Sequence, residues 1–432
     1  MSKYLYPLIF GAQKTIFAGN NLQPLLKKFY FLGLFLVSAA THLFAQQTTS
    51  ATTNSTEQVG APVDSSKQRD LIDFFVKVFG IKSDNQRTVA HKLSLSIVPS
   101  VSYSLTTGFQ ADLTANAGFY TTKTHKENYS EITGDLTYDT KNQKLSVFRS
   151  QVWFADNEYK LVTDTRWERF PEDTYGLGTT TTLSQVDHID FKYVRSYFTI
   201  YKRISSDFYG GVGYDLDYHY GINFTSKPDS IPTSYTTYGF HPTAISSGFN
   251  VSLLFDNRKN PINPLQGGYA SVIYRQNQTL LGSSANWQSL QFDLRRYFRL
   301  SENNNNILTV WSLLWFTHGN VPYLDLPGTG EDMFNNSGRG YIQGRFTGRN
   351  MLYLESEYRF GLTQNGLLGG VLFANAESVS EYPGNSFTKV APAIGTGLRV
   401  KMNKHSNTNI CIDYAVGINK SNGIFLNLGE IF

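Results

Sequence analysis

The chain has 432 residues, of which 41% are hydrophobic, 15% aromatic and only 17% charged. Its 27 Tyr, 31 Phe and 36 Gly favour many strands and tight turns over several soluble domains. The single cysteine, Cys411, excludes an internal disulfide framework and a cysteine-based zinc site.

Residues 1–45 are expected to be a signal peptide. Lys27 and Lys28 precede the apolar stretch "FYFLGLFLVSAA", and "HLFA" ends at Ala45, a small residue suited to cleavage. The apolar run is shorter than the ~20 residues that a membrane-spanning helix needs. The segment holds four Lys and no acidic residue, so its removal takes 38 basic residues to 34, against 34 acidic residues. The mature chain would then be neutral, and nothing in it indicates nucleic-acid binding.

Residues 46–90 are predicted to be a short periplasmic segment. The stretch "QQTTSATTNSTEQVGAPVDSSKQ" is rich in Ser, Thr and Gln, which is typical of a flexible linker. In "RDLIDFFVKVFGIK", Leu71, Phe75 and Val78 recur at helical spacing, which predicts a short amphipathic helix over residues 68–80. The sequence leaves open whether this helix lies on the membrane surface or in the mouth of a barrel.

Hydrophobicity alternates with a period of two from residue 91 to residue 432. In "MLYLESEYRFGL", for example, Leu352 and Leu354 share one face while Glu355, Glu357 and Arg359 share the other. Polar or Gly-rich breaks separate about sixteen such segments. We expect strands that start near residues 92, 109, 129, 144, 159, 186, 207, 240, 268, 285, 306, 349, 367, 391, 407 and 424.

These segments fit an all-β, transmembrane antiparallel barrel over residues 91–432 better than a soluble sandwich. Export, strands of ~10 residues, apolar/polar alternation and plentiful aromatic residues are typical of such barrels. Within a bilayer only helices and closed barrels satisfy every backbone group. The mean hydropathy of -0.29 agrees with a barrel, because its inward face is polar. The last strand, "GIFLNLGEIF", is expected to end with Phe432 at the membrane boundary.

Four ordered motifs resemble the BamA/TamA-type bacterial surface antigen barrels. "FDNRKNPINPLQGGY" (Phe255–Tyr269) is similar to the signature turn of that family, and "SGRGYIQGRF" to the Arg-Gly-aromatic motif of its long sixth extracellular loop. "YLESEYRF" is similar to the strand that follows, and "LNLGEIF" to the C-terminal strand signal. The resemblance runs from Val194 to Phe432.

The resemblance implies sixteen strands, with the signature turn periplasmic and the "GRGY" loop extracellular. Our strand count agrees, because these breaks follow the eighth and eleventh predicted strands. The periplasmic repeat domains of family members that assemble or translocate proteins are not expected here, since only a linker and a helix precede the barrel.

The resemblance also implies that the long loop folds inward and docks on the barrel wall. Gly338 and Gly340 would let the backbone bend around Arg339. Strand parity turns Glu357 inward, where it can pair with the Arg339 guanidinium. The residues of this predicted loop lock are Gly338, Arg339, Gly340, Tyr341, Glu357, Phe373 and Asn375.

Asn375 stands where the family usually has an Asp, so Glu357 is expected to be the main partner of Arg339. By the same resemblance, Leu428, Gly429 and Phe432 form a predicted assembly signal that meets the assembly machinery on the periplasmic side. The alternative for the loop is a mobile external segment with solvated arginines.

No catalytic motif is present. The sequence has no G-x-S-x-G elbow, no H-E-x-x-H and no phosphate-binding Gly loop with a Lys. The histidines are scattered, so we expect no enzymatic activity, no cofactor and no metal site.

Three functions remain open. The first is a role in outer-membrane biogenesis, in which the barrel inserts proteins or lipids. The second is a passive pore for small solutes, and the third is a structural surface antigen. An inward-folded loop favours the first, because it would obstruct a pore. The expected location is the outer membrane of a Gram-negative-type bacterium. The expected partners are outer-membrane lipids, the barrel assembly machinery and separate periplasmic proteins.

Overall fold

The computed structural model describes Arg69 and residues 94–104, 108–122, 128, 130–224, 234–239, 241–258, 260–301, 306–404 and 407–432. The chain divides into two compact units, Met1–Gln58 and Val59–Phe432, and every described residue belongs to the second. The predicted signal peptide lies outside the described residues, as does the predicted linker and helix of residues 46–90 apart from Arg69.

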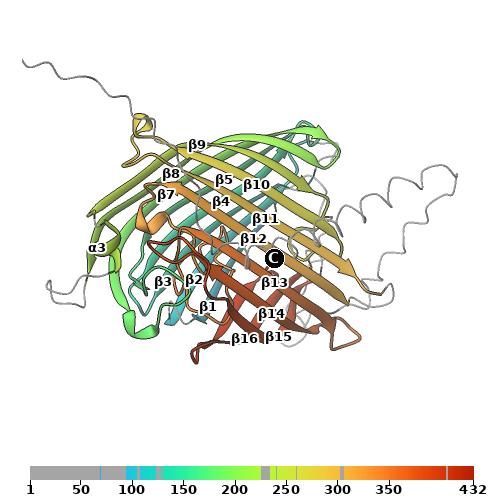
Figure 1. Cartoon of the computed structure of the whole chain (residues 1–432). Helices are drawn as coiled ribbons and strands as arrows, with labels where there is room; N and C mark the ends of the chain where they lie inside the picture. Colours follow the sequence, from blue (N-terminus) through green and yellow to red (C-terminus); the bar gives the residue numbers. More distant parts are fainter. Residues whose placement is uncertain are drawn as a thin grey trace, which may run out of the picture. The chain divides into compact units, whose positions relative to one another are not determined.

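Sixteen long strands form one antiparallel wall in the described part of the chain, and each pairs with the next (Figure 1). They are β1 (Ser94–Ser104), β2 (Gly108–Phe119), β3 (Ser130–Asp139), β4 (Lys144–Phe154), β5 (Tyr159–Arg169), β7 (Asp187–Ser205), β8 (Phe208–Phe224), β9 (Thr243–Asp256), β10 (Gly267–Asn277), β11 (Trp287–Arg299), β12 (Ile307–Gly319), β13 (Asn350–Gly361), β14 (Leu368–Val379), β15 (Ala391–Asn403), β16 (Thr408–Gly417) and β17 (Asn422–Leu428).

The remaining described elements are short. The three-residue strand β6 (Glu172–Thr174) pairs with the first residues of β7. The helices are η1 (Leu183–Gln185), α3 (Ser234–Gly239), η2 (Thr279–Leu281) and η3 (Tyr323–Asp325).

The predicted fold class is confirmed: the described chain is nearly all β and its strands are antiparallel. Each predicted start lies within three residues of the start of a wall strand. The alternation locates the strands well because each one has a lipid-facing and a lumen-facing side. The sequence does not predict β6, since three residues are too few to show a period.

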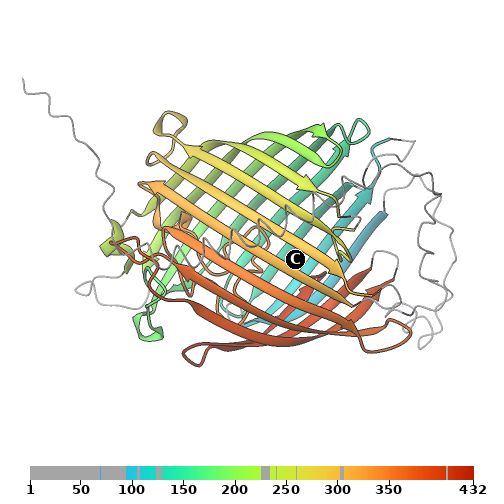
Figure 2. The ribbon, with the colours of Figure 1, turned by 45° about the vertical axis from the view of Figure 1, so that its right-hand side comes forward.

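The first and last strands meet at a junction that we call the seam. β1 lies beside β17, yet no backbone ladder joins them within the described residues. Every other pair of neighbouring wall strands shares a ladder of seven or more residue pairs. Figure 2 shows the wall as a continuous curved sheet of tilted strands. The seam is therefore the weakest line in the wall.

The two faces of the wall differ in polarity. On β9, Phe249 and Val251 are each 58% exposed on the outside, whereas Asn250 and Ser252 are buried on the inside. An apolar outer face and a polar inner face suit a wall with lipid outside and a polar lumen within. No described helix is long and apolar enough to cross a bilayer.

The barrel has two distinct ends. Residues 257–266 connect β9 to β10 at one end, which we call the turn end. Residues 320–349 connect β12 to β13 at the opposite end, the loop end, because three antiparallel strands separate the two connections. β17 runs toward the turn end, as the predicted strand count requires.

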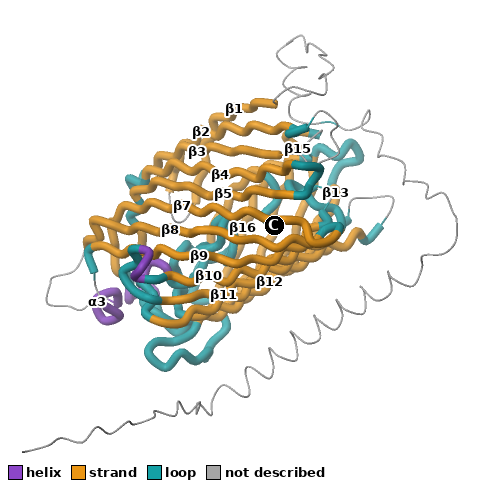
Figure 3. The backbone as a smooth tube through the Cα atoms, turned by 90° about the horizontal axis from the view of Figure 1, so that it is seen from above, coloured by secondary structure: helices purple, strands orange, loops and turns teal. Residues whose placement is uncertain are grey.

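Several connections interlock over the loop end, where Figure 3 shows α3 beside the loops. The Gly178 N–H donates to the Thr347 carbonyl at 2.8 Å, and the Val379 N–H donates to Thr179 Oγ1 at 2.8 Å. The ring of Tyr235 on α3 lies 4.8 Å from that of Tyr323. These contacts tie separate loops into one cover above the lumen.

Candidate functional site

Residues 320–349 fold into the lumen, and two glycines shape their turn around Arg339. Gly338 has φ +81° and Gly340 has φ +108°, both in the left-handed region that favours glycine. A Cβ on Gly340 would lie 2.8 Å from the Cβ of Ala393 on β15. Glycine is needed here because the turn is left-handed and is pressed against the wall.

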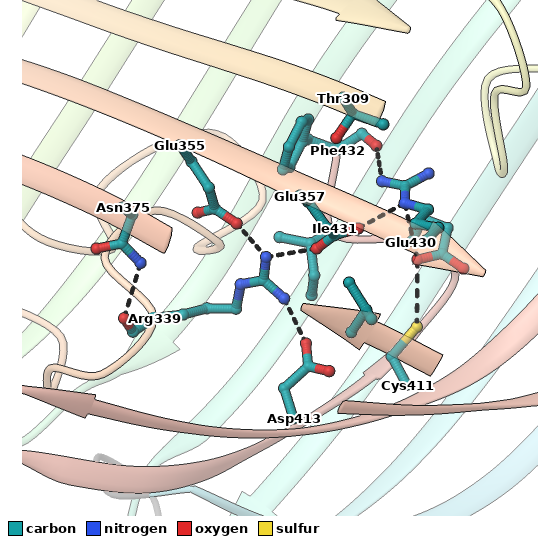
Figure 4. Close-up of polar contacts among 12 residues, drawn as sticks. Thr309, Arg339, Glu355, Glu357, Asn375, Cys411, Asp413, Glu430, Ile431 and Phe432 are labelled. Carbon is teal, nitrogen blue, oxygen red and sulfur yellow. Dashed lines mark hydrogen bonds and ion pairs between the residues drawn. The ribbon is translucent and has the colours of Figure 1, made fainter. Parts of the chain in front are cut away.

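The Arg339 guanidinium contacts three carboxylates at once (Figure 4). Nη1 lies 2.5 Å from Asp413 Oδ2 on β16, and Nη2 lies 2.5 Å from Glu357 Oε2 on β13. Nη2 also bonds Glu355. The Arg339 Cζ lies 3.5 Å from the centre of the Phe373 ring, which covers one face of the guanidinium. The structure thus brings Arg339 to the predicted Glu357 and Phe373.

The other residues of the predicted lock hold the backbone of the loop. Asn375 Nδ2 donates to the Arg339 carbonyl at 2.9 Å, so it contacts the backbone of Arg339 rather than its guanidinium. The Tyr341 hydroxyl donates to the Pro392 carbonyl at 2.6 Å and accepts the Ile418 N–H at 3.1 Å. Asn375 therefore positions the turn, whereas an Asp there would add a fourth negative charge.

Two further arginines surround this contact. Arg359 Nε lies 2.5 Å from Glu357 Oε1, and Arg399 Nη1 lies 2.5 Å from Asp413 Oδ1. Arg399 Nε also lies 2.9 Å from Glu430 Oε2. Buried charges are stable only when paired and hydrogen-bonded. We call the seven residues the lumen network: Arg339, Glu355, Glu357, Arg359, Arg399, Asp413 and Glu430.

The C-terminal tail enters the lumen from the turn end. β17 ends at Leu428, and Gly429, with φ +90°, turns the chain inward. Phe432 is 3% exposed, and its ring centre lies 5.2 Å from that of Trp311. Arg359 Nη2 donates to the Phe432 carbonyl at 2.9 Å, and Asn336 Nδ2 donates to the Ile431 carbonyl at 2.8 Å. Loop and tail therefore meet inside the barrel.

This tail corrects one prediction. Phe432 was expected to close the last strand at the membrane boundary, but it is buried in the lumen because the positive φ of Gly429 ends β17 early. The side chain of Leu428 lies outside the described residues. The assembly-signal role of Leu428, Gly429 and Phe432 stays a prediction.

Two partners were missed from the sequence. Glu357 was expected to be the main partner of Arg339, but Glu355 and Asp413 share the charge. The alternation of "TNICIDYAVGIN" places Asp413 on the inward face, which was the available signal. Glu430 was not assigned to the lumen, because the last strand was expected to continue to Phe432, whereas β17 ends at Leu428.

The comparisons with known proteins agree with this geometry. Residues 130–425 match the Omp85 superfamily domain. The chain belongs to the Omp85 superfamily. Its predicted resemblance to the BamA/TamA-type barrels is confirmed, and barrels of this superfamily are outer-membrane proteins of Gram-negative bacteria.

Two solved structures share the fold of this Omp85 barrel. One is BamA from Haemophilus ducreyi lacking POTRA domains 1-3, with 13% identity, a TM-score of 0.50, and coverage of 78% of this chain and 69% of that chain. The other is CdiB from Escherichia coli, with 9% identity, a TM-score of 0.50, and coverage of 78% and 67%. A search of curated protein sequences found no match.

The loop of this Omp85 barrel also reaches the opposite wall. Arg166 Nη2 on β5 donates to the Met333 carbonyl at 2.7 Å, and Arg149 Nη2 on β4 donates to the same carbonyl at 3.3 Å. The Arg149 Cζ lies 5.6 Å from the centre of the Phe334 ring. Arg166 is held by Asp164, at 2.7 Å. The loop therefore spans the lumen from β13 and β16 to β4 and β5.

Near the loop end, η3 of the same loop carries a buried acid. Asp325 Oδ2 accepts the Ser246 hydroxyl at 2.6 Å, and its Oδ1 lies 3.7 Å from His219 Nδ1. Burial raises the pKa of Asp325 to about 7, and the negative charge of Asp217 adds to the rise. Arg275 opposes the rise, since it lies 2.6 Å from Asp217 and favours negative charge in this region.

The lumen offers electrostatic anchoring rather than an evident reaction centre. The described residues include no group of three or more His, Cys, Asp or Glu that could hold a metal ion. The buried Cys411 donates to the Gly429 carbonyl at 3.1 Å, so it helps to hold the tail. The expectation of no enzymatic activity stays a prediction.

Proposed function

We propose that the chain acts in outer-membrane biogenesis and inserts proteins or lipids into the membrane at the seam. The observation that carries this proposal is the missing ladder between β1 and β17, since every other neighbouring pair is joined. Unpaired strand edges expose backbone N–H and C=O groups that can template another strand. Such an edge inside a membrane would offer an incoming strand the hydrogen bonds that lipid lacks.

The contents of the lumen argue against the passive pore. The loop of residues 320–349 crosses the lumen, the tail Glu430–Phe432 fills space beside it, and further loops cover the loop end. A solute would have to displace a buried ion network to pass along the axis. Outer-membrane lipids, the barrel assembly machinery and separate periplasmic proteins are the partners that this function would need.

The seam can be locked to test the proposal. With Cys411→Ser as background, cysteine pairs would be scanned between β1 and β17, and the pair that oxidises would be used. Leu354→Cys with Ala376→Cys serves as the matched control, because these residues face each other in the β13–β14 ladder. The readout is folding of an unfolded outer-membrane barrel protein into liposomes that contain the chain.

We expect the oxidised seam to slow this assisted folding strongly, reduction to restore it, and the control disulfide to have little effect. An oxidised seam that assists folding as well as the reduced one would refute the proposal. Steady conductance in planar bilayers, unchanged by the seam disulfide, would instead support the pore.

A further inference from the structure

A cavity of about 350 Å³ remains in the lumen beside the loop. It is lined by residues of β5, β6, β7 and β8, by residues of the 320–349 loop, and by residues 425–427 of β17 and Ile431 of the tail. This volume lies at the lower end of the range for small-ligand pockets. Arg339 of the lumen network also lines the cavity, but the three carboxylates that Arg339 contacts do not.

Four carboxylates line this cavity, and two of them have no partner. Glu168 on β5 is only 6% exposed, and neither it nor Glu172 on β6 has a hydrogen bond or ion pair within the described residues. Asp173 bonds His188, and Glu331 accepts Gln343 Nε2 at 3.2 Å. An ionised carboxylate as buried as that of Glu168 is costly without a counter-charge, which points to a missing cation.

The arginines that line the cavity form their ion pairs with carboxylates outside it. Arg166 is paired with Asp164 at 2.7 Å, Arg195 lies 3.5 Å from Asp164, and Arg339 is held by its three carboxylates. In addition, His219 is 3% exposed, lines the cavity, and its Nδ1 has no hydrogen-bond partner. The cavity is therefore lined by polar groups from β5, β6 and β8 that have no hydrogen-bond partner within the described residues.

The groups suit an organic cation better than a metal ion. No three of the described acids and histidines are arranged to hold one metal ion. The rings of Phe170, Tyr193 and Phe334 line the same cavity and can contact alkyl chains or ammonium groups. We propose that the cavity binds a small organic amine with more than one ammonium group, held by Glu168, Glu172 and Glu331.

The electrostatics of Glu172 and Glu331 support this site. Burial raises the pKa of Glu172 well above its usual range, and the nearby Glu331 adds to the rise. Burial likewise raises the pKa of Glu331. Both shifts mean that the empty cavity favours the neutral, protonated acids, and an ammonium group bound between them would favour their ionised forms.

Binding of spermidine to the purified full chain in detergent tests the site. Isothermal titration calorimetry would compare the parent, Glu168→Gln/Glu172→Gln and Glu158→Gln. Glu158 is the matched control, because it pairs with Arg203 at 3.2 Å in a turn-end connection and does not line the cavity. Sodium chloride at equal ionic strength and magnesium chloride serve as ligand controls.

We expect saturable binding of spermidine to the parent and the control, and an affinity about tenfold or more weaker in the double variant, since charge-assisted hydrogen bonds are lost. Undetectable binding to the parent, or equal affinity in all three proteins, would overturn the proposal. So would displacement of spermidine by an equal concentration of magnesium, which would indicate a metal site.

Folding of each variant is checked by its heat-modifiable mobility on gels. Should the double variant fail to fold, Glu168→Gln alone would be measured against the same control, with the same expected loss. Failure of both variants to fold would also contradict the proposal, because the carboxylates would then stabilise the barrel itself rather than hold a ligand.

Discussion

The loop of residues 320–349 touches the barrel wall on two sides, and the chemistry of the two contacts is reversed. On the β13–β16 side, the loop supplies the charge, and Arg339 enters a ring of wall carboxylates. On the β4–β5 side, the wall supplies the charge, and Arg149 and Arg166 bond a neutral carbonyl of the loop. The first contact depends on one side chain, whereas the second can form with any residue at position 333.

The two contacts should also differ in strength. Removal of one partner from a buried ion pair costs about 3–5 kcal/mol, whereas a hydrogen bond to a charged group contributes about 1.5–3 kcal/mol. If the seam opens, β4 and β5 move with β1, and β16 moves with β17. We therefore expect the loop to leave the β4–β5 side first and to stay docked at Arg339.

Arg339→Glu should have the largest effect. It removes the central cation and adds a fifth carboxylate to the lumen network, so we expect a loss of about 3–5 kcal/mol and a lower melting temperature. Adding Glu357→Arg should restore part of the loss. Thermal unfolding and protease resistance in detergent measure both. If Arg339→Glu alone melted like wild type and resisted protease equally well, the loop lock would not exist.

Phe432→Ala should have the next largest effect. It removes a buried ring that packs on Trp311, and truncation of a buried Phe costs about 3 kcal/mol at the low end of its range. Phe432→Asp should also slow barrel assembly and lower its abundance in the outer membrane. Heat-modifiable mobility and yield are the measurements. If both variants kept the heat-modifiable mobility and yield of wild type, Phe432 would contribute neither to stability nor to assembly.

Arg149→Met should have a smaller effect, confined to the β4–β5 side. The residue is partly exposed, its bond to the Met333 carbonyl is 3.3 Å long, and its contact with Phe334 contributes about 0.5–1 kcal/mol. We expect faster amide exchange at residues 331–337 with little change in melting temperature. A fall in melting temperature as large as that of Arg339→Glu would contradict the expectation that the Arg339 contact is the stronger of the two.

A change of pH should have the most local effect, confined to the docking of η3. The pKa of Asp325 is raised to about 7 in the folded chain, from an ordinary value of 3.8. Protonation therefore favours docking of η3, and this stability is lost as pH rises from about 4 to about 7. Amide exchange around η3 should be faster at pH 8 than at pH 5, after correction for the intrinsic rate. Asp325→Asn should remove this difference in exchange between pH 8 and pH 5. If the difference persisted in Asp325→Asn, another titrating group would be its cause.

The wall and part of the lock could be predicted from the sequence. Strand starts followed from the period of two, and parity on one strand turned Glu355 and Glu357 inward. Asp413 was not assigned to Arg339, because parity gives the face of a strand but not which distant strands meet a loop. No sequence pattern predicts the contact of Arg166 with the Met333 carbonyl, because tertiary packing sets the path of the loop.

The C-terminal tail shows another limit of prediction from the sequence. "GIFLNLGEIF" is mostly apolar and ends in an aromatic residue, so it predicted a strand ending at Phe432. One positive φ at Gly429 is enough to turn Glu430 and Phe432 into the lumen. Such a turn is compatible with the sequence but is not required by it.

Hydrogen exchange on the full chain in lipid nanodiscs tests the docked loop most directly. The backbone amides of residues 338–341 would be compared with those of β13 in wild type, Arg339→Gln and the matched Arg149→Met. We predict protection of residues 338–341 in wild type and in Arg149→Met, and its loss in Arg339→Gln while β13 stays protected. Rapid exchange of residues 338–341 in wild type, or equal protection in Arg339→Gln, would contradict the account.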